Sequence, residues 1–299
     1  MNETLTTADG RPALRIERRL AHPPGKVWRA LTEPEHLSRW YPFTATELDL
    51  RLGGLIAFDD GRGTVMDAVI TELDPPRRFA FSQRAPEGMA RESEDLVRFE
   101  LHPEGEGCVL VFTHVFDDRF AAASYASGWQ VCLDALSAEL DGAPPEVRRP
   151  SAESHDAYIE RFGLDAGSAE ETADGWQVRF ERQLTRPAET VWTLLTGGSR
   201  TDAPEPAVGG PVPRGFTAED IPPGEVTAAE RPAVLVYTWQ SAGRTAGRVR
   251  WDLSPGTGHG ARLVLTQTGP EEADTERGTA LAAWRRRIAE LAAQLRELP

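Results

Sequence analysis

The sequence predicts an α+β protein built from two related domains in tandem, each a curved antiparallel sheet wrapped around a long C-terminal helix. The first observation behind this prediction is an internal repeat: 8 of the 17 positions from Ile16 to Thr32 are identical to the positions 164 residues later. The second is a series of short segments with alternating apolar and polar residues, separated by Gly and Pro, which is typical of antiparallel strands. The third is an amphipathic segment with helical spacing at the end of each half.

A strand and two short helices open the first half. Residues 14–20 alternate apolar and charged side chains and therefore predict a strand. Pro23-Pro24 then opens a helix, because proline is tolerated in the first helical turn. Thr32 and Glu35 have the spacing of a capping box, so a second short helix is expected to begin at Thr32 and to end near Trp40.

Six further strands and a long helix complete this half. Gly53-Gly54 predicts a two-residue hairpin between the first two of these strands. The long helix is predicted over residues 124–140, where apolar side chains recur on one helical face. The expected strands cover residues 46–52, 55–59, 64–73, 78–83, 95–102 and 108–116.

The second half repeats this pattern incompletely. It keeps the first strand, the first helix, the last strands and a long helix over residues 280–298. It has no counterpart of the second short helix, because residues 197–213 are rich in Gly, Pro and Ala, and its first hairpin is expected to be shortened to residues near 211–217. The expected organisation is a first domain over 1–164, a linker at about 164–174 and a degenerate second domain over 174–299.

Composition narrows the class of protein. The net charge of −14 disfavours nucleic-acid binding, which needs a basic face. No apolar run approaches the roughly 20 residues that cross a bilayer, and the N-terminus lacks a signal pattern, so a soluble cytoplasmic protein is expected. The dominance of Arg over Lys is typical of a GC-rich bacterial genome.

Cys108 and Cys132 are interpreted as buried thiols. The histidines lack metal-ligand spacing and the Gly-rich turns join strands, so neither a metal nor a cofactor is expected.

One segment carries a recognisable signature. Residues 20–40 read L-A-H-P-P-G-K-V-W-R-A-L-T-E-P-E-H-L-S-R-W, and Asp74-Pro75-Pro76, Thr113-His114 and Ser127-Gly128-Trp129 extend the pattern. On these residues the chain resembles the START-like (SRPBCC, helix-grip) superfamily and, within it, the homologues of the activator of the heat-shock-protein-90 ATPase. The second half resembles the same fold with less of the signature. The resemblance implies a deep, largely apolar cavity between sheet and long helix, in which members of the wider superfamily bind or cyclise lipids, sterols or polyketides.

The candidate ligand-binding residues follow from this cavity and from side-chain periodicity. Phe112 and His114 share one face of a strand, and Trp129 and Leu133 share one face of the long helix, so the two pairs are expected to face each other. Trp40, Tyr41 and Phe43 follow the second short helix, where the resemblance places the rim of the cavity; ordinary core packing is the alternative. The full predicted set is Trp40, Phe43, Phe58, Phe81, Phe99, Phe112, His114, Tyr125, Trp129 and Leu133.

His114 has two interpretations. A neutral imidazole in the cavity could orient a carbonyl or act as an acid or base. Alternatively, it is a buried histidine hydrogen-bonded to its neighbours. Its counterpart in the second half is Gln267, so proton chemistry at this position is expected only in the first domain.

Three functions therefore stay open. The first is a soluble helix-grip protein that binds a small apolar molecule between sheet and C-terminal helix, mainly in the first domain, without catalysis, nucleic acid or membrane insertion. The second is an aromatase/cyclase-like enzyme acting on a polyketide or other carbonyl-rich substrate, with His114 as its acid or base. The third, a chaperone ATPase-regulating interaction protein, rests on the name of the resembled family alone.

Overall fold

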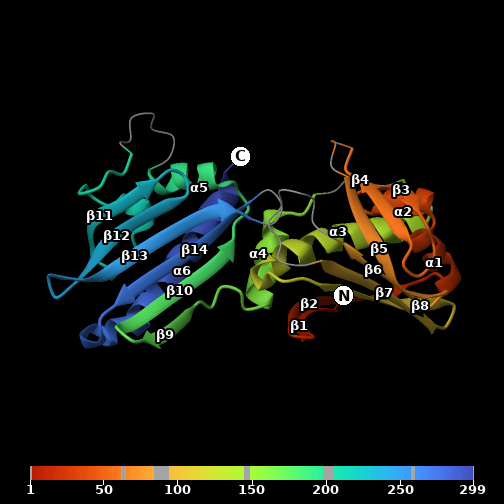
Figure 1. Ribbon diagram of the computed structural model, residues 1–299, viewed down its shortest axis with the longest axis horizontal. Helices are drawn as coiled ribbons and strands as arrows, with labels where there is room; N and C mark the ends of the chain where they lie inside the picture. The colour runs from red at the N-terminus through yellow and green to blue at the C-terminus, as the bar shows by residue number, and fades with distance from the viewer. Residues whose placement is uncertain are drawn as a thin grey trace. The chain divides into compact units, whose positions relative to one another are not determined.

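The chain folds into two compact units, which span Met1–Ser151 and Ala152–Pro299. Figure 1 shows the computed structural model, and each unit is described by itself. The division groups residues 152–164 with the second unit, and the boundaries expected from the sequence stay a prediction. The structure describes residues 2–61, 63, 65–83, 94–144, 149–197, 205–256 and 260–298.

An eight-stranded antiparallel sheet forms the framework of the first domain. Alternate side chains along its strands are buried, as the apolar and polar alternation of the sequence predicts. In sheet order the strands are β1 (Asn2–Ala8), β2 (Arg11–Leu20), β8 (Gly107–Val115), β7 (Asp95–Glu104), β6 (Arg78–Gln83), β5 (Val65–Asp74), β4 (Leu55–Asp59) and β3 (Thr44–Leu48).

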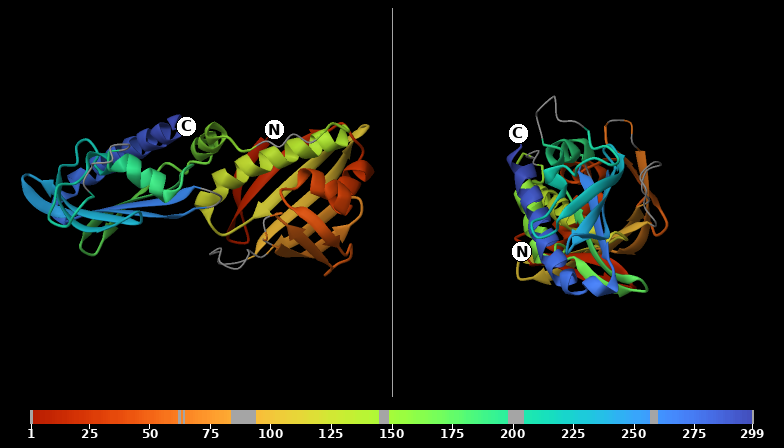
Figure 2. Two further views of the ribbon diagram at one scale, coloured as in Figure 1. Left: turned by 90° about the horizontal axis from the view of Figure 1, so that it is seen from above. Right: turned by 90° about the vertical axis from the view of Figure 1, so that its left-hand side faces the viewer.

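A long helix lies along one face of this sheet. Figure 2 shows α3 (Ala122–Leu140) in that position. Its buried side includes Trp129, Leu133 and Leu136, which pack toward the sheet as their helical spacing predicts. Two short helices, α1 (Pro24–Thr32) and α2 (Pro34–Trp40), follow β2, and the turn η1 (Arg119–Ala121) leads into α3.

The second domain has a six-stranded antiparallel sheet with its own long helix, α6 (Thr275–Glu297), along one face. The remaining helical segments are α4 (Ala152–Arg161), α5 (Ala188–Leu195), η2 (Arg214–Phe216) and η3 (Glu271–Ala273). In sheet order the strands are β11 (Pro223–Glu230), β12 (Val234–Ser241), β13 (Arg244–Pro255), β14 (Ala261–Gly269), β10 (Gly175–Gln183) and β9 (Ser168–Thr172).

The two domains share one topology. His114 on β8 lies opposite Val97 on β7, and Gln267 on β14 lies opposite Val249 on β13, so the sequence repeat holds at the level of strand register. The order β2-β8-β7-β6-β5 of the first sheet corresponds to β10-β14-β13-β12-β11 of the second. In the described part of the second domain, no element corresponds to α2, β3 or β4. The predicted tandem α+β architecture is confirmed.

The predicted capping box at Thr32 is wrong. Helix α1 continues through Thr32, whose hydroxyl donates to the carbonyl of Trp28 instead of capping a new helix. Helix α2 begins at Pro34 with Glu33 at its N-cap and without a side-chain cap. Proline has a fixed φ that suits the first helical turn, which accounts for this later start.

The predicted two-residue hairpin at Gly53-Gly54 is also wrong. Strand β3 ends at Leu48 and β4 begins at Leu55, so the connection is longer. The N–H of Gly53 donates to the carbonyl of Ile70, and the N–H of Ile70 donates to the carbonyl of Gly54. The glycine pair therefore bonds to β5 rather than closing the turn.

Three further differences lie where side-chain alternation gives little signal. The sequence analysis missed β1, and it placed a linker where β9 occurs, a strand whose side chains are all exposed. The shortened hairpin expected near residues 211–217 is instead the single turn η2, preceded by an isolated bridge from Pro211 to Glu225. None of the described helices has the length and apolar character that a bilayer-spanning segment needs.

Candidate functional site

An aromatic cluster lies between the sheet and the long helix in the first domain. The strands supply Phe58, Phe81, Phe99 and Phe112 from alternate positions, and α3 supplies Trp129. Phe112 and Trp129 approach to 4.2 Å between ring centroids, which confirms that strand and helix faces meet as their periodicities predict. Leu133 is fully buried on the same helix face.

The other predicted residues lie around this cluster. Phe43 is half-buried and its ring contacts that of Phe58 at 6.5 Å, while Tyr125 is half-buried and its ring contacts that of His114 at 4.5 Å. Trp40 is buried, contacts Phe99, and donates its indole N–H to the carbonyl of Ala30. Trp40 thus lies in the core rather than at a rim.

Tyr41 stands at the centre of the cluster, although the sequence analysis placed it at the rim and left it out of the predicted binding set. Its ring stacks on Phe58 at 4.7 Å and contacts Trp129 at 5.9 Å. Its hydroxyl donates to Oε1 of Gln83 at 3.3 Å. Burial raises the pKa of Tyr41 far above its ordinary value, so the phenol stays neutral.

Both ring nitrogens of His114 are engaged inside the domain. Trp129 Nε1 donates to His114 Nδ1 at 3.1 Å, and an indole N–H can only donate. Nδ1 must therefore be the unprotonated nitrogen, which assigns the proton of the neutral ring to Nε2. Nε2 lies 3.2 Å from Oδ2 of Asp95, so it donates to that carboxylate.

Asp95 is the second residue that the sequence analysis missed. It is buried, and Oδ2 also lies 3.4 Å from the hydroxyl of Tyr125. A signal was present, because Asp95 is in phase with Val97 and Phe99 on the buried face of β7. Side chains that we name the polar chain thus cross the apolar interior in the order Tyr125, Asp95, His114 and Trp129.

The second domain keeps only one link of the polar chain. Trp284 Nε1 donates to Oε1 of Gln267 at 2.5 Å, which reproduces the bond from tryptophan to strand. By strand register and helix alignment, Gly247 occupies the position of Asp95 and Ala280 that of Tyr125. The Nε2 atom of Gln267 is correspondingly buried without a hydrogen-bond partner.

Two tryptophan side chains lie in the part of the second domain around Gly247. Trp239 stands where the first domain has Gln83, opposite Gly247. Its ring lies 5.7 Å from that of Trp176, and both are fully buried. One position that carries a polar side chain in the first domain, Gln83, thus carries a large aromatic ring in the second.

Cys132 lies on α3 near Tyr41. Burial raises the pKa of the Cys132 thiol to about 12, so it is protonated at neutral pH and is not a reactive thiolate. Among the described residues, no group of three or more His, Cys, Asp or Glu side chains is placed to hold a metal ion.

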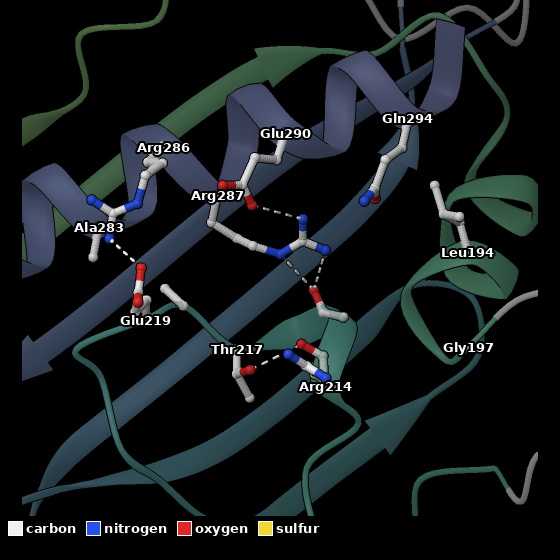
Figure 3. A pocket seen from close by; sticks show the side chains of 12 residues that line it. Leu194, Gly197, Arg214, Thr217, Glu219, Ala283, Arg286, Arg287, Glu290 and Gln294 are labelled. Carbon is white, nitrogen blue, oxygen red and sulfur yellow. Dashed lines mark hydrogen bonds and ion pairs between the residues drawn. The ribbon is translucent and has the colours of Figure 1, made fainter. Parts of the chain in front are cut away.

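Helix α2 covers one side of α3 in the first domain. His36 Nδ1 lies 2.7 Å from Oε1 of Glu139 on α3, and Arg39 reaches the same oxygen at 3.5 Å. In the second domain, a groove of about 770 Å³ runs along the corresponding side of α6. Figure 3 shows this groove between α6, the end of α5 and η2, with Arg287 crossing it.

The sequence model of one family, described as activator of Hsp90 ATPase homolog 1-like protein, matches residues 21–141 and 204–296. No curated protein matches the chain. Among solved structures, CalU16 from Micromonospora echinospora is 28% identical over 53% of this chain and 96% of that chain, with a TM-score of 0.44. MLL2253 from Mesorhizobium loti is 25% identical over 44% and 97%, with a TM-score of 0.40.

A third solved structure spans both domains. DynU16, described as a protein in the dynemicin biosynthetic locus, is 19% identical over 95% of this chain and 98% of that chain, with a TM-score of 0.43. The family match covers both halves and more than half of the residues. The chain therefore belongs to the family of activator of Hsp90 ATPase homolog 1-like proteins.

Proposed function

We propose that this protein binds a small, planar, mostly apolar molecule in its first domain, against the aromatic cluster and beside the polar chain. An apolar lining with a few convergent polar groups is the usual composition of a small-molecule site. Here the lining is aromatic, and the polar groups are the hydroxyls of Tyr41 and Tyr125 and the Asp95–His114 pair.

The observation that carries this proposal is the joint loss of the polar chain from the second domain. Three positions differ together: Asp95 becomes Gly247, His114 becomes Gln267 and Tyr125 becomes Ala280. The second domain packs its core without a buried carboxylate at this place, so the fold does not need one. Burying a charged group is costly, so a role in binding accounts best for its retention in the first domain.

The polar groups also indicate the class of ligand. A tyrosine hydroxyl that donates one hydrogen bond can still accept others. The hydroxyl of Tyr41 donates to Gln83, so its oxygen keeps acceptor capacity. A planar molecule with one hydroxyl or N–H donor matches this acceptor, and its rings would stack on the aromatic cluster.

Binding without catalysis fits His114 better than general-base chemistry. A general base must have a free nitrogen within hydrogen-bond reach of the substrate proton. In His114 the unprotonated Nδ1 already accepts from Trp129, and the other nitrogen donates to Asp95. A cyclase-like reaction would first have to displace the indole N–H of Trp129.

Titration calorimetry with 1-naphthol, a planar molecule with one hydroxyl donor, tests the proposal on the full chain. Tyr41→Phe should weaken binding by about fivefold, the effect of one neutral hydrogen bond. The matched change in the second domain, Tyr237→Phe, should leave affinity unchanged, because that hydroxyl donates to the carbonyl of Phe216. Equal effects of both changes, or no binding of 1-naphthol, would contradict a site in the first domain.

A further inference from the structure

The groove in the second domain is lined by charged side chains that the first domain lacks. With Trp284 aligned on Trp129, Arg287 occupies the position of Cys132, Arg286 that of Val131, and Gln294 that of Glu139. In the first domain this side of the long helix is covered by α2, which binds Glu139. In the second domain Gln294 is exposed and lines the groove instead.

Arg287 is the central cation of the groove. Its side chain is only 12% exposed, and its Nε and Nη2 atoms donate to the carbonyl of Gly215 at 3.1 and 2.8 Å. Nη1 lies 3.7 Å from Glu290, beyond hydrogen-bond distance. Burial lowers the pKa of Arg287, as expected for a cation whose lost hydration is incompletely replaced.

Two more arginines stand at the rim. Arg286 reaches Glu219 only at 3.4 Å and Asp220 at 3.5 Å, longer than a strong charge-assisted bond. Arg214 is exposed, and within the part of the chain that the structure describes no carboxylate pairs with it. Three guanidinium groups therefore line one groove in a protein of net charge −14, and their neighbours neutralise them only in part.

The groove also has an apolar component. Leu194 from α5, Ala218 and Ala283 contribute apolar surface beside the arginines. Figure 3 shows Leu194 and Gln294 beside the same opening as Arg287. A volume of about 770 Å³ is within the range of sites that hold small organic molecules.

We propose that this groove is a second binding site, for a small organic anion whose acidic group pairs with Arg287 and Arg214 and whose apolar body lies against Leu194. A guanidinium presents planar N–H donors that match a carboxylate, which fits the donors left free on Arg287. The site is independent of the ligand proposed for the first domain, because it uses different residues and selects for charge.

Binding of 2-naphthoate and of its uncharged methyl ester to the full chain tests this site by calorimetry. Neither compound carries the hydroxyl or N–H donor that the site proposed for the first domain selects. Naphthoate should bind at least about tenfold more tightly than the ester, the effect of one charge-assisted hydrogen bond. Arg214→Gln should weaken naphthoate by about fivefold and leave the ester unchanged. Equal affinity for the two compounds, or no binding of naphthoate, would overturn the proposal.

Arg285→Gln is the control for charge. It removes the same charge from the same helix, but Arg285 pairs with Asp165 outside the groove. Its effect on naphthoate should stay below about twofold, because exposed charges at a distance are screened by salt. If Arg285→Gln weakens binding as much as Arg214→Gln, the anion responds to net charge and the groove is not its site.

Arg287→Gln tests the floor of the groove. It should weaken naphthoate by about tenfold, since a cation and its donors are lost. This variant also loses the bonds to the carbonyl of Gly215, so its thermal unfolding must be measured beside its affinity. The side chain of Arg214 has no hydrogen-bond or ion-pair partner among the described residues. Arg214→Gln therefore still tests the proposal if Arg287→Gln does not fold.

Discussion

Trp129 donates its indole N–H to Nδ1 of His114 across 3.1 Å, and this bond joins the long helix of the first domain to strand β8. The second domain makes the same link from Trp284 to Gln267. An indole can only donate, so the strand must offer an acceptor at this position, and either an imidazole or an amide oxygen serves. The feature that both domains retain is the acceptor rather than the imidazole.

His114→Gln should therefore be tolerated, with a loss of about 1 kcal/mol or less in the free energy of unfolding. The amide oxygen can accept from Trp129, and the amide N–H can donate toward Asp95. His114→Leu should cost about 2–4 kcal/mol, because it leaves an indole N–H and a carboxylate buried without this partner. Urea unfolding of the two variants measures the difference, and equal losses would show that the hydrogen bonds of His114 do not hold the helix.

Glu139→Gln should loosen helix α2. The Glu139 side chain is 9% exposed and accepts from His36 and Arg39. The described residues of the second domain contain no counterpart of α2, and Gln294 stands at the position of Glu139. Loss of these charge-assisted bonds should raise amide hydrogen exchange in residues 34–40 by about tenfold while α3 stays protected. Glu35→Gln is the control, because Glu35 is 80% exposed and also pairs with Arg39. Equal exchange in both variants would contradict a role for Glu139 in holding α2.

Asp156 anchors α4 within the second domain. Burial would raise the pKa of its carboxyl, but His155 at 3.6 Å, Arg182 at 2.7 Å and Arg296 together hold that pKa well below the ordinary range. A depressed carboxyl pKa contributes stability above its unfolded value of about 4, and this contribution is lost as the pH falls through the folded value.

Asp156→Asn should consequently cost about 3 kcal/mol at pH 7, because Arg182 is left buried without its counter-ion. The difference in unfolding free energy between the wild type and the variant should shrink as the pH falls below about 4. There the carboxyl of Asp156 binds a proton in the unfolded wild type but stays ionised in the folded protein. Unfolding at a series of pH values measures this. A difference that stays constant down to pH of about 2 would mean that the charge of Asp156 does not stabilise the domain.

The architecture could be predicted because its signals are local. The helical spacing of Trp129 and Leu133 and the strand alternation of Phe99 and Phe112 identify the buried faces without knowledge of the partner elements. The composition change near residues 197–213 predicted that the second short helix has no counterpart, and the described residues of the second domain contain none. Strand β9 was missed because all its side chains are exposed, and β1 was missed because its one buried side chain is the polar Glu3.

The polar chain could be predicted only in part. His114 was recognised, but its partner Asp95 depends on the register between β7 and β8, which the sequence does not give. The tautomer of His114 follows only once Trp129 is placed against Nδ1. The sequence favoured a solvent-exposed helix face for Arg285-Arg286-Arg287, with a docking site for an acidic partner or lipid headgroup as the alternative. It gave no sign that the Arg287 side chain is only 12% exposed and lies in a groove.

The second domain provides a design for the variant that tests the central claim. In the first domain Gln83 lies opposite Asp95, and in the second Trp239 lies opposite Gly247. A Cβ atom at Gly247 would lie 2.0 Å from the carbonyl oxygen of Thr268 and 2.8 Å from the indole nitrogen of Trp239. The glycine thus leaves room both for the neighbouring strand and for Trp239, so the two positions should change together. Gln83→Trp with Asp95→Gly should fill the proposed ligand site with a side-chain arrangement that the fold already accommodates.

Native mass spectrometry of the freshly purified full chain, as wild type and as this double variant, tests most directly whether the first domain holds a small molecule. The account predicts a bound molecule of defined mass on the wild type and none on the variant, with both proteins folded by circular dichroism. A wild type that carries nothing, or a variant that retains the same molecule in the same amount, would contradict the proposed site.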